Sequence, residues 1–216
     1  KNTLEMNNLL KISRAILASK QAVSYRVNIK NQLIIQDIPD TIISIDIETI
    51  DGIILEIGAV MFSRSSSQVL HVYHDLSEGV IIDKNSTSVK DDYVSMFNGE
   101  DSQFDVKREC GFNKIENDIY KYHKKLINNF KKWIEKFNEY NLLQWSGNDS
   151  KILELDVISI DMHKLYKVYL ENNGEKRKSN TKLTDGVNQI LNPSFFKAHR
   201  ALEDAIATMA LFITLT

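Results

Sequence analysis

The 216-residue sequence has one cysteine and two prolines, and it lacks any long hydrophobic run. The single cysteine, Cys110, excludes an internal disulfide and a cysteine-rich zinc module, which fits a reducing intracellular compartment. No apolar stretch approaches the roughly 20 residues that cross a bilayer, so we expect no membrane interaction. The net charge of −2 indicates no general affinity for nucleic acid, and any such surface has to be local.

The composition predicts a folded protein. A hydrophobic content of 43% with only eight glycines is typical of a chain that buries a core. We expect a main domain over residues 41–216 and an N-terminal appendage over residues 1–40, with a helix followed by a hairpin. The appendage packs on the domain or binds a partner or substrate, and the sequence supports both equally. Because the chain begins with Lys1 rather than methionine, we expect that it was cut from a longer polypeptide.

Residues 41–62, TIISIDIETIDGIILEIGAVMF, have the clearest pattern in the sequence. The apolar residues after position 41 predict a strand, which places Asp46 and Glu48 on one face because side chains alternate along a strand. Two neighbouring carboxylates repel each other, which raises a pKa unless a cation lies between them, and a divalent metal ion is the natural cation. Asp51-Gly52 predicts a tight turn before a second strand over residues 53–62. Charged residues at a strand end are more often simply solvated, so this pattern needs support from elsewhere.

The next segments predict a third strand and a long helix. Residues 69–75 complete an antiparallel meander, in which His71 and His74 fall on opposite faces and are not expected to bind metal. Residues 76–114 are polar and form either a functional loop near the site or an insertion. Residues 115–137 carry apolar side chains at spacings of three and four, which predicts an amphipathic helix with a lysine-rich, solvated outer face.

A second acidic position follows another strand. Residues 142–145 predict a buried strand, and the next helix begins at Asn148 or Asp149, either of which can cap it. We expect a short strand over residues 157–160, a helix over residues 162–169 with an ordinary His163, and a basic loop over residues 175–180. That loop increases solubility or contacts backbone phosphates.

The C-terminal part predicts a short amphipathic helix around residues 183–191 and then an apolar terminal helix. In the terminal helix, Asp204 shares a face with Ala201, Thr208 and Leu211, which indicates that it points into the packing. A carboxylate in that position needs a partner. Glu203 is one position round the helix and can point at solvent, so it is the less interesting acid for a site.

Taken in order, Asp46-x-Glu48, Asp149, and His199 with Asp204 in AHRALEDAIAT resemble the three motifs of the DEDDh family. Members of this family are 3′–5′ exonucleases related to the proofreading subunit of bacterial replicative polymerases. The resemblance covers roughly residues 41–215. It implies an α/β, RNase H-like exonuclease fold with a mixed central sheet, an antiparallel meander plus parallel strands, flanked by helices.

The resemblance also implies the chemistry of the site. Two Mg²⁺ or Mn²⁺ ions are held by four carboxylates, namely Asp46, Glu48, Asp149 and Asp204. His199 is the general base for the attacking water, and the product is a nucleoside 5′-monophosphate. Thr49 and the backbone around Ile47 occupy positions that lie beside the terminal nucleotide in relatives.

Two other functions remain open from the sequence. One is a nucleic-acid-binding module that keeps the fold without catalysis, and the other is a subunit that works only in a larger polypeptide, polymerase or other nucleic-acid-processing assembly. None of the five motif residues is missing, which favours the enzyme. The expected ligand is the 3′ end of single-stranded DNA or RNA, and the choice between the two depends on a few side chains near the sugar.

Overall fold

The computed structural model describes residues 40–50, 53–77, 89, 112–157, 159–175, 181–191 and 198–216. Several predictions fall outside these residues: the appendage over residues 1–40, the turn at Asp51-Gly52, most of residues 76–114, and the basic loop after residue 175. The division of the chain into residues 1–40 and 41–216 therefore stays a prediction.

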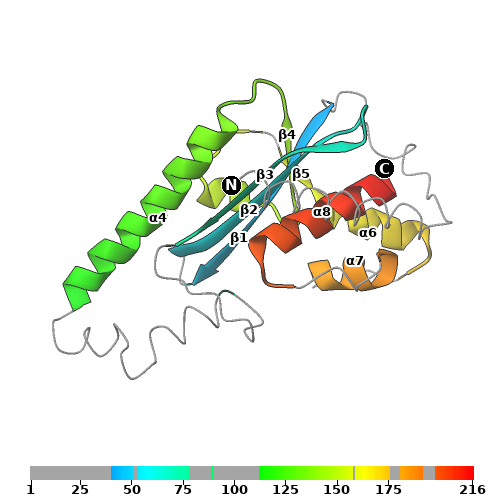
Figure 1. Ribbon diagram of the computed structural model, residues 1–216. Coiled ribbons are helices and arrows are strands. Elements are labelled where there is room, and N and C mark those ends of the chain that lie inside the picture. The colour runs from blue at the N-terminus through cyan, green and yellow to red at the C-terminus, as the bar shows by residue number, and fades with distance from the viewer. Residues whose placement is uncertain are drawn as a thin grey trace.

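The described residues form a five-stranded sheet in the order β3-β2-β1-β4-β5 (Figure 1). The strands are β1 (Thr41–Ile50), β2 (Ile53–Ser63), β3 (Gln68–Leu76), β4 (Asn141–Gln144) and β5 (Ser159–Asp161). The pairs β1–β2 and β2–β3 are antiparallel, whereas β1–β4 and β4–β5 are parallel. The predicted mixed sheet, a meander extended by parallel strands, is confirmed.

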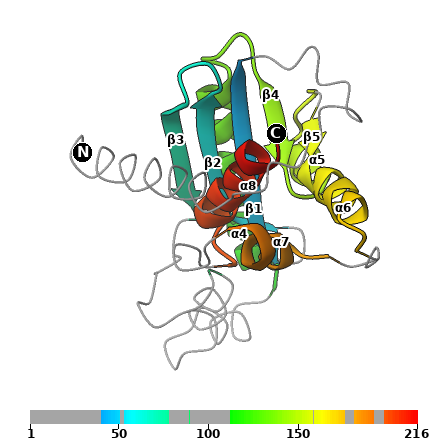
Figure 2. The ribbon, with the colours of Figure 1, turned by 90° about the vertical axis from the view of Figure 1, so that its right-hand side faces the viewer.

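Helices cover both faces of this sheet. They are α4 (Phe112–Ile134), α5 (Asp149–Ile152), α6 (Met162–Asn172), α7 (Leu183–Ile190) and α8 (Ala201–Leu215). Figure 1 shows α4 on one side of the sheet and α8 with α6 and α7 on the other, and Figure 2 shows α8 lying over β1 and β2. The predicted α/β fold class is confirmed. Among the described helices, none is both long enough and apolar enough to cross a membrane.

Strand β1 lies in the middle of the sheet, and its side chains alternate between two cores. Ile42 packs with residues of α6, α7 and α8, whereas Ile43, Ile45 and Ile47 pack against α4. Because the period of a strand is two, residues 46 and 48 share the α8 side with Ile42. The strand therefore directs two acidic side chains toward the helix that carries Asp204.

Gly58 allows α8 to lie directly against the sheet. It is the register partner of Asp46 in the β1–β2 pair. A Cβ atom at this position would lie 2.2 Å from the backbone nitrogen of Leu202, and 2.3 Å from the carbonyl carbon of Ala201. Real side chains do not tolerate such contacts with backbone atoms, so only glycine allows this close approach of strand and helix. The first turn of α8, which leads to Asp204, is thereby brought close to β1.

Candidate metal centre

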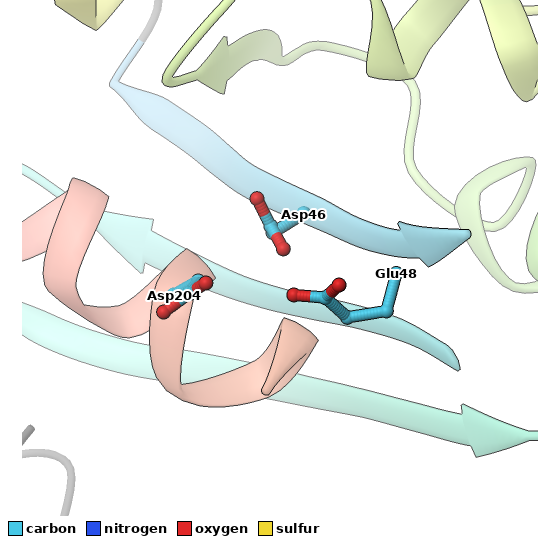
Figure 3. Close-up of side chains that lie close together, drawn as sticks. All are labelled: Asp46, Glu48 and Asp204. Carbon is cyan, nitrogen blue, oxygen red and sulfur yellow. The ribbon is translucent and has the colours of Figure 1, made fainter. Parts of the chain in front are cut away.

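Three carboxylates converge between β1 and the first turn of α8. Asp46, Glu48 and Asp204 each offer one oxygen, and these oxygens lie within 4.8 Å of one another. Figure 3 shows the three side chains directed toward a common point, two from the strand and one from the helix. Asp204 is only 9% exposed, as its predicted position on the packed face of the helix requires. The structure thus joins the first and last acidic motifs of the sequence.

The regular pairing of β1 with β2 is interrupted directly after Glu48. Glu48 pairs with Glu56, but Thr49 pairs with Ile54, so one residue of β2 is left over in a bulge. Next to the bulge, the Ile54 N–H donates a hydrogen bond of 3.1 Å to Nδ1 of His123 in α4. Bulges bend a strand and redirect its side chains, and they often lie beside active sites. Helix α4 therefore supports the strand end that carries Glu48.

Burial and repulsion by neighbouring acids raise the pKa values of two of these carboxyl groups. The pKa of Asp46 lies well above its usual value, first because the group is buried and then because of the charges of Asp149, Asp204, Glu48 and Glu56. Burial followed by the charge of Glu48 raises the pKa of Asp204 to about 8. A divalent cation among these oxygens reverses both effects, since it favours the ionised carboxylates.

Asp204 has one oxygen that suits a metal ligand. Its Oδ2 accepts a hydrogen bond of 3.2 Å from the backbone N–H of His199. Its Oδ1 is buried and has no hydrogen-bond partner within the described part of the chain. A buried carboxylate oxygen without a partner is costly in a folded protein, and hard oxygen donors are the ligands that Mg²⁺ and Mn²⁺ prefer. The residues present fit a divalent metal ion.

The second motif brings a further acid close to this group. Asp149 is the first residue of α5, after β4, and it is half-buried. Its carboxylate lies outside the group of three, but burial and then the charge of Glu48 raise its pKa to about 7. Asn148 occupies the N-cap position without a side-chain cap bond. The simple interpretation of Asp149 as the helix cap is therefore wrong, and the residue is left for another role.

Gln144, a residue that the sequence analysis passed over, caps α5 instead. Its side chain is fully buried at the end of β4. Oε1 accepts a 3.0 Å hydrogen bond from the Ser150 N–H, while Nε2 donates to the hydroxyls of Ser150 and Ser159 at 3.0 and 2.7 Å. The amide therefore fixes the start of the helix that begins with Asp149. A glutamine at the end of an apolar strand was the available signal, because a buried amide needs partners.

His199 lies immediately before α8 and is exposed. Its φ of 67° is in the left-handed region, which is uncommon for residues other than glycine although histidine is enriched there. Through its N–H it is tied to the carboxylate of Asp204. The structure thus links the predicted general base to one of the acids through the backbone.

The predicted substrate-binding positions and Glu203 lie in different environments. Ile47 packs into the core against α4, on the face opposite the acids, so only its backbone is left for contact with a substrate. Thr49 is half-buried just beyond the bulge. The substrate-binding role of both residues stays a prediction. Glu203 is half-buried, and burial raises its pKa.

Glu56 is another acid that the sequence analysis passed over. It is 1% exposed, and it stands directly opposite Glu48 across the β1–β2 pair. Its Oε2 accepts a 3.0 Å hydrogen bond from the Ala201 N–H, and its Oε1 lies 2.6 Å from Nε2 of His74. A glutamate within the apolar segment that forms β2 was a detectable signal. As predicted, His71 lies on the other face of the sheet, where its ring packs against an aromatic ring just beyond the C-terminal end of α4.

Comparison with known proteins gives likenesses of fold only. No family model matches the sequence, and neither does any curated protein. Cell-death related nuclease 4 has 15% sequence identity and a TM-score of 0.48, with 81% of this chain and 62% of that chain covered. A full-length 3′-exonuclease has 18% identity and a TM-score of 0.48, with 82% and 60% covered. This chain therefore spans about 60% of the length of both proteins.

The match with a third solved structure extends over most of that structure's length. This structure is the nuclease domain of 3′hExo bound to rAMP, with 18% identity and a TM-score of 0.46, and with 81% of this chain and 90% of that chain covered. That protein is described as a DEDDh family member, the family that the motifs of this sequence resemble.

Proposed function

We propose that this chain is a metal-dependent 3′–5′ exonuclease of the DEDDh type, which removes nucleoside 5′-monophosphates from the 3′ end of single-stranded DNA or RNA. The observation that carries the proposal is the convergence of Asp46, Glu48 and Asp204, whose oxygens lie within 4.8 Å of one another in a buried setting. Such an arrangement is costly by itself, and phosphodiester hydrolysis by metal ions is the reaction that makes use of it.

The three converging carboxylates, with Asp149 beside them, would hold two Mg²⁺ or Mn²⁺ ions. When bound, the ions offset the negative charge that develops on the attacking and leaving oxygens of the phosphodiester. The chain supplies only carboxylate oxygens to the converging group, which suits Mg²⁺ and Mn²⁺ better than softer metals.

His199 would take the proton of the attacking water. Its exposure leaves the imidazole accessible to water and substrate, and the bond from its N–H to Asp204 places its backbone next to the metal-binding acids. Histidine is the usual general base at neutral pH because its charge changes in that range. Thr49 and the backbone of Ile47 would lie beside the 3′-terminal nucleotide, at the end of β1 where the acids are.

The experiment is degradation of 5′-labelled single-stranded DNA and RNA with Mg²⁺, Mn²⁺ or EDTA. We expect a ladder that shortens stepwise from the 3′ end, requires metal, and is lost in Asp46→Asn and His199→Ala. Asp156→Asn is the matched control, because Asp156 is an exposed acid outside the site and its loss should leave the rate unchanged.

Two outcomes would contradict the proposal. Binding of the strands without cleavage under any metal indicates the catalytically silent or partner-dependent subunit that the sequence leaves open. Cleavage that persists in EDTA or in Asp46→Asn indicates chemistry that does not use the acidic cluster. The same gel compares the two sugars directly and so decides between DNA and RNA.

A further inference from the structure

We infer that Glu56 is a positioning residue, which caps helix α8 from strand β2 and thereby fixes both Asp204 and His199 for the reaction. The inference rests on the proposed exonuclease function. It gives a role in that function to an acid that neither the motifs nor the metal-binding group includes.

Helix α8 has no cap of its own. Its N-cap residue is Arg200, which makes no side-chain cap hydrogen bond, and the first N–H groups of any helix lack an acceptor within the helix. The Ala201 N–H, the first in α8, donates instead to Oε2 of Glu56 at 3.0 Å. A negative charge at a helix N-terminus is also favourable because of the helix dipole. Glu56 therefore replaces the missing local cap.

Both oxygens of Glu56 are engaged in this arrangement. Oε1 lies 2.6 Å from Nε2 of His74, on strand β3, and the side chain is 1% exposed. A carboxylate with two such partners satisfies the hydrogen-bonding need of a buried acid. The converging group within the described ranges consists of Asp46, Glu48 and Asp204, without Glu56. Glu56 is thus built to hold the helix rather than a metal ion.

The position of the first turn of α8 decides where both functional residues lie. The Asp204 N–H donates to the Arg200 carbonyl at 2.8 Å, and the His199 N–H donates to Oδ2 of Asp204 at 3.2 Å. These two bonds make residues 199–204 one connected unit. Since Ala201 lies inside this unit, a shift of its N–H away from β2 moves the carboxylate and the histidine together.

Strand β2 holds this unit at two points. Glu56 binds the Ala201 N–H, and Gly58, two residues further on and on the same face, lets the helix backbone touch the strand. Glu56 is also the register partner of Glu48. The strand pair that carries the first acidic motif therefore also fixes the distance to the last one.

A neutral amide performs the corresponding task at α5. There Gln144 accepts the Ser150 N–H, while the N-cap Asn148 makes no side-chain cap bond. The comparison shows that a side-chain oxygen from a strand is sufficient to cap a helix, and that a charge is not required. It follows that glutamine should replace Glu56 well: its oxygen can accept the Ala201 N–H while its amide donates to His74.

The test compares Glu56→Gln and Glu56→Ala in single-turnover and steady-state hydrolysis of a 3′ end by the full chain with Mg²⁺. We expect Glu56→Gln to stay within about threefold of the wild-type kcat, whereas Glu56→Ala should lose about 10- to 100-fold in kcat with KM little changed. Leu215→Ala is the matched control, since it removes a buried side chain at the far end of the same helix. It should lower stability while kcat of the folded protein is retained.

A second readout does not depend on activity. Amide hydrogen exchange of the metal-free protein should show a protected Ala201 N–H in the wild type, although it is a first-turn amide. Protection should persist in Glu56→Gln and in Leu215→Ala, and it should be lost in Glu56→Ala. If the wild type hydrolyses no substrate, the proposed function fails, and the exchange data still decide whether Glu56 caps the helix.

Three results would overturn the inference. If Glu56→Gln loses as much kcat as Glu56→Ala, the charge of Glu56 matters rather than its capping oxygen. If Glu56→Ala keeps the wild-type kcat when fully folded, the cap does not position the site. If the Ala201 amide is unprotected in the wild type, the cap is absent in solution.

Discussion

Replacing Asp204 with asparagine is expected to stabilise the metal-free protein while it abolishes hydrolysis. The carboxylate is buried among other acids, and its pKa is raised to about 8. Asparagine has the same shape, and its oxygen can still accept the His199 N–H that now bonds to Oδ2. The substitution therefore removes a group that folding has to keep protonated, without opening a cavity or breaking the bond to the histidine.

The magnitude follows from the difference in pKa between the unfolded and folded states. The unfolded value is 3.8 and the folded value about 8, so at pH 7 folding has to suppress ionisation over roughly three pH units. At about 1.4 kcal/mol for each unit, the upper limit is about 4 kcal/mol. The repulsion is shared with the neighbouring acids, so we expect a gain of about 2 kcal/mol. For a chain of this length, this corresponds to an increase in Tm of about 4–8 °C.

The sign of the pH dependence is fixed by the raised pKa. A group of this kind contributes stability that is fully present below pH 3.8 and is lost as the pH rises through about 8. The wild type therefore loses this contribution over that interval, whereas the asparagine variant has nothing to ionise there. The advantage of the variant should be close to zero near pH 4 and largest near pH 8.

Thermal unfolding in EDTA at several pH values measures this difference, with the exposed Asp156→Asn as control. A Mg²⁺ titration at pH 8 completes the assay: the wild type should gain stability by mass action, and the variant should gain much less. The reasoning is refuted if Asp204→Asn is less stable than the wild type in EDTA at pH 8. It is equally refuted if the gain is the same at pH 4 and pH 8.

Three further substitutions test how the fold supports the site. Gly58→Ala should lower the free energy of unfolding in urea by about 3 kcal/mol and remove most of the activity, because its Cβ would lie 2.2 Å from a backbone nitrogen of α8. Gly147→Ala is the control: a Cβ there would have no atom within 4 Å, so stability and activity should both be unchanged. Gln144→Ala should lower the free energy of unfolding by about 1–3 kcal/mol and reduce kcat, because it leaves a buried N–H of α5 without its acceptor. Unchanged stability of this variant would contradict the role of Gln144 as a cap. The neutral ring of His123 accepts the Ile54 N–H, and burial lowers the pKa of this histidine. Its contribution to the stability of the fold is therefore fully present above about pH 6.5 and is lost as the pH falls further. Denaturation at pH 7 and pH 5 should therefore show a smaller loss of stability in His123→Gln than in the wild type, and equal losses would refute this role.

The sequence predicted those parts of the site that depend on local periodicity. Asp46 and Glu48 share a face because a strand has a period of two, and Asp204 is buried because it lies among small and apolar residues of one helix face. Each inference needs only the residues within one element. The antiparallel meander of the first three strands followed in the same way, from the short turns between apolar segments, whereas the parallel strands were implied only by the family resemblance.

The polar supports of the site could not be predicted in this way. Glu56 and Ala201 are separated by 145 positions in the sequence, and no local pattern indicates which N–H a buried glutamate will meet. The partial burial of Glu203 could not be predicted for the same reason. A helix-face argument counts neighbours within α8, whereas the charges near Glu203 include Glu56 of β2 and His74 of β3, which meet it only after folding.

The acids of the site repel one another, so their convergence has to be produced by other interactions. Gly58 allows the helix and strand to touch, and Glu56 and Gln144 hold the starts of α8 and α5 through backbone N–H groups. None of these contacts involves a metal ion. For the proposed metal site, the contribution of these contacts and that of the acids can be separated by mutation: asparagine at an acid should remove metal binding and relieve repulsion, whereas alanine at a cap should leave the acids intact and misplace them.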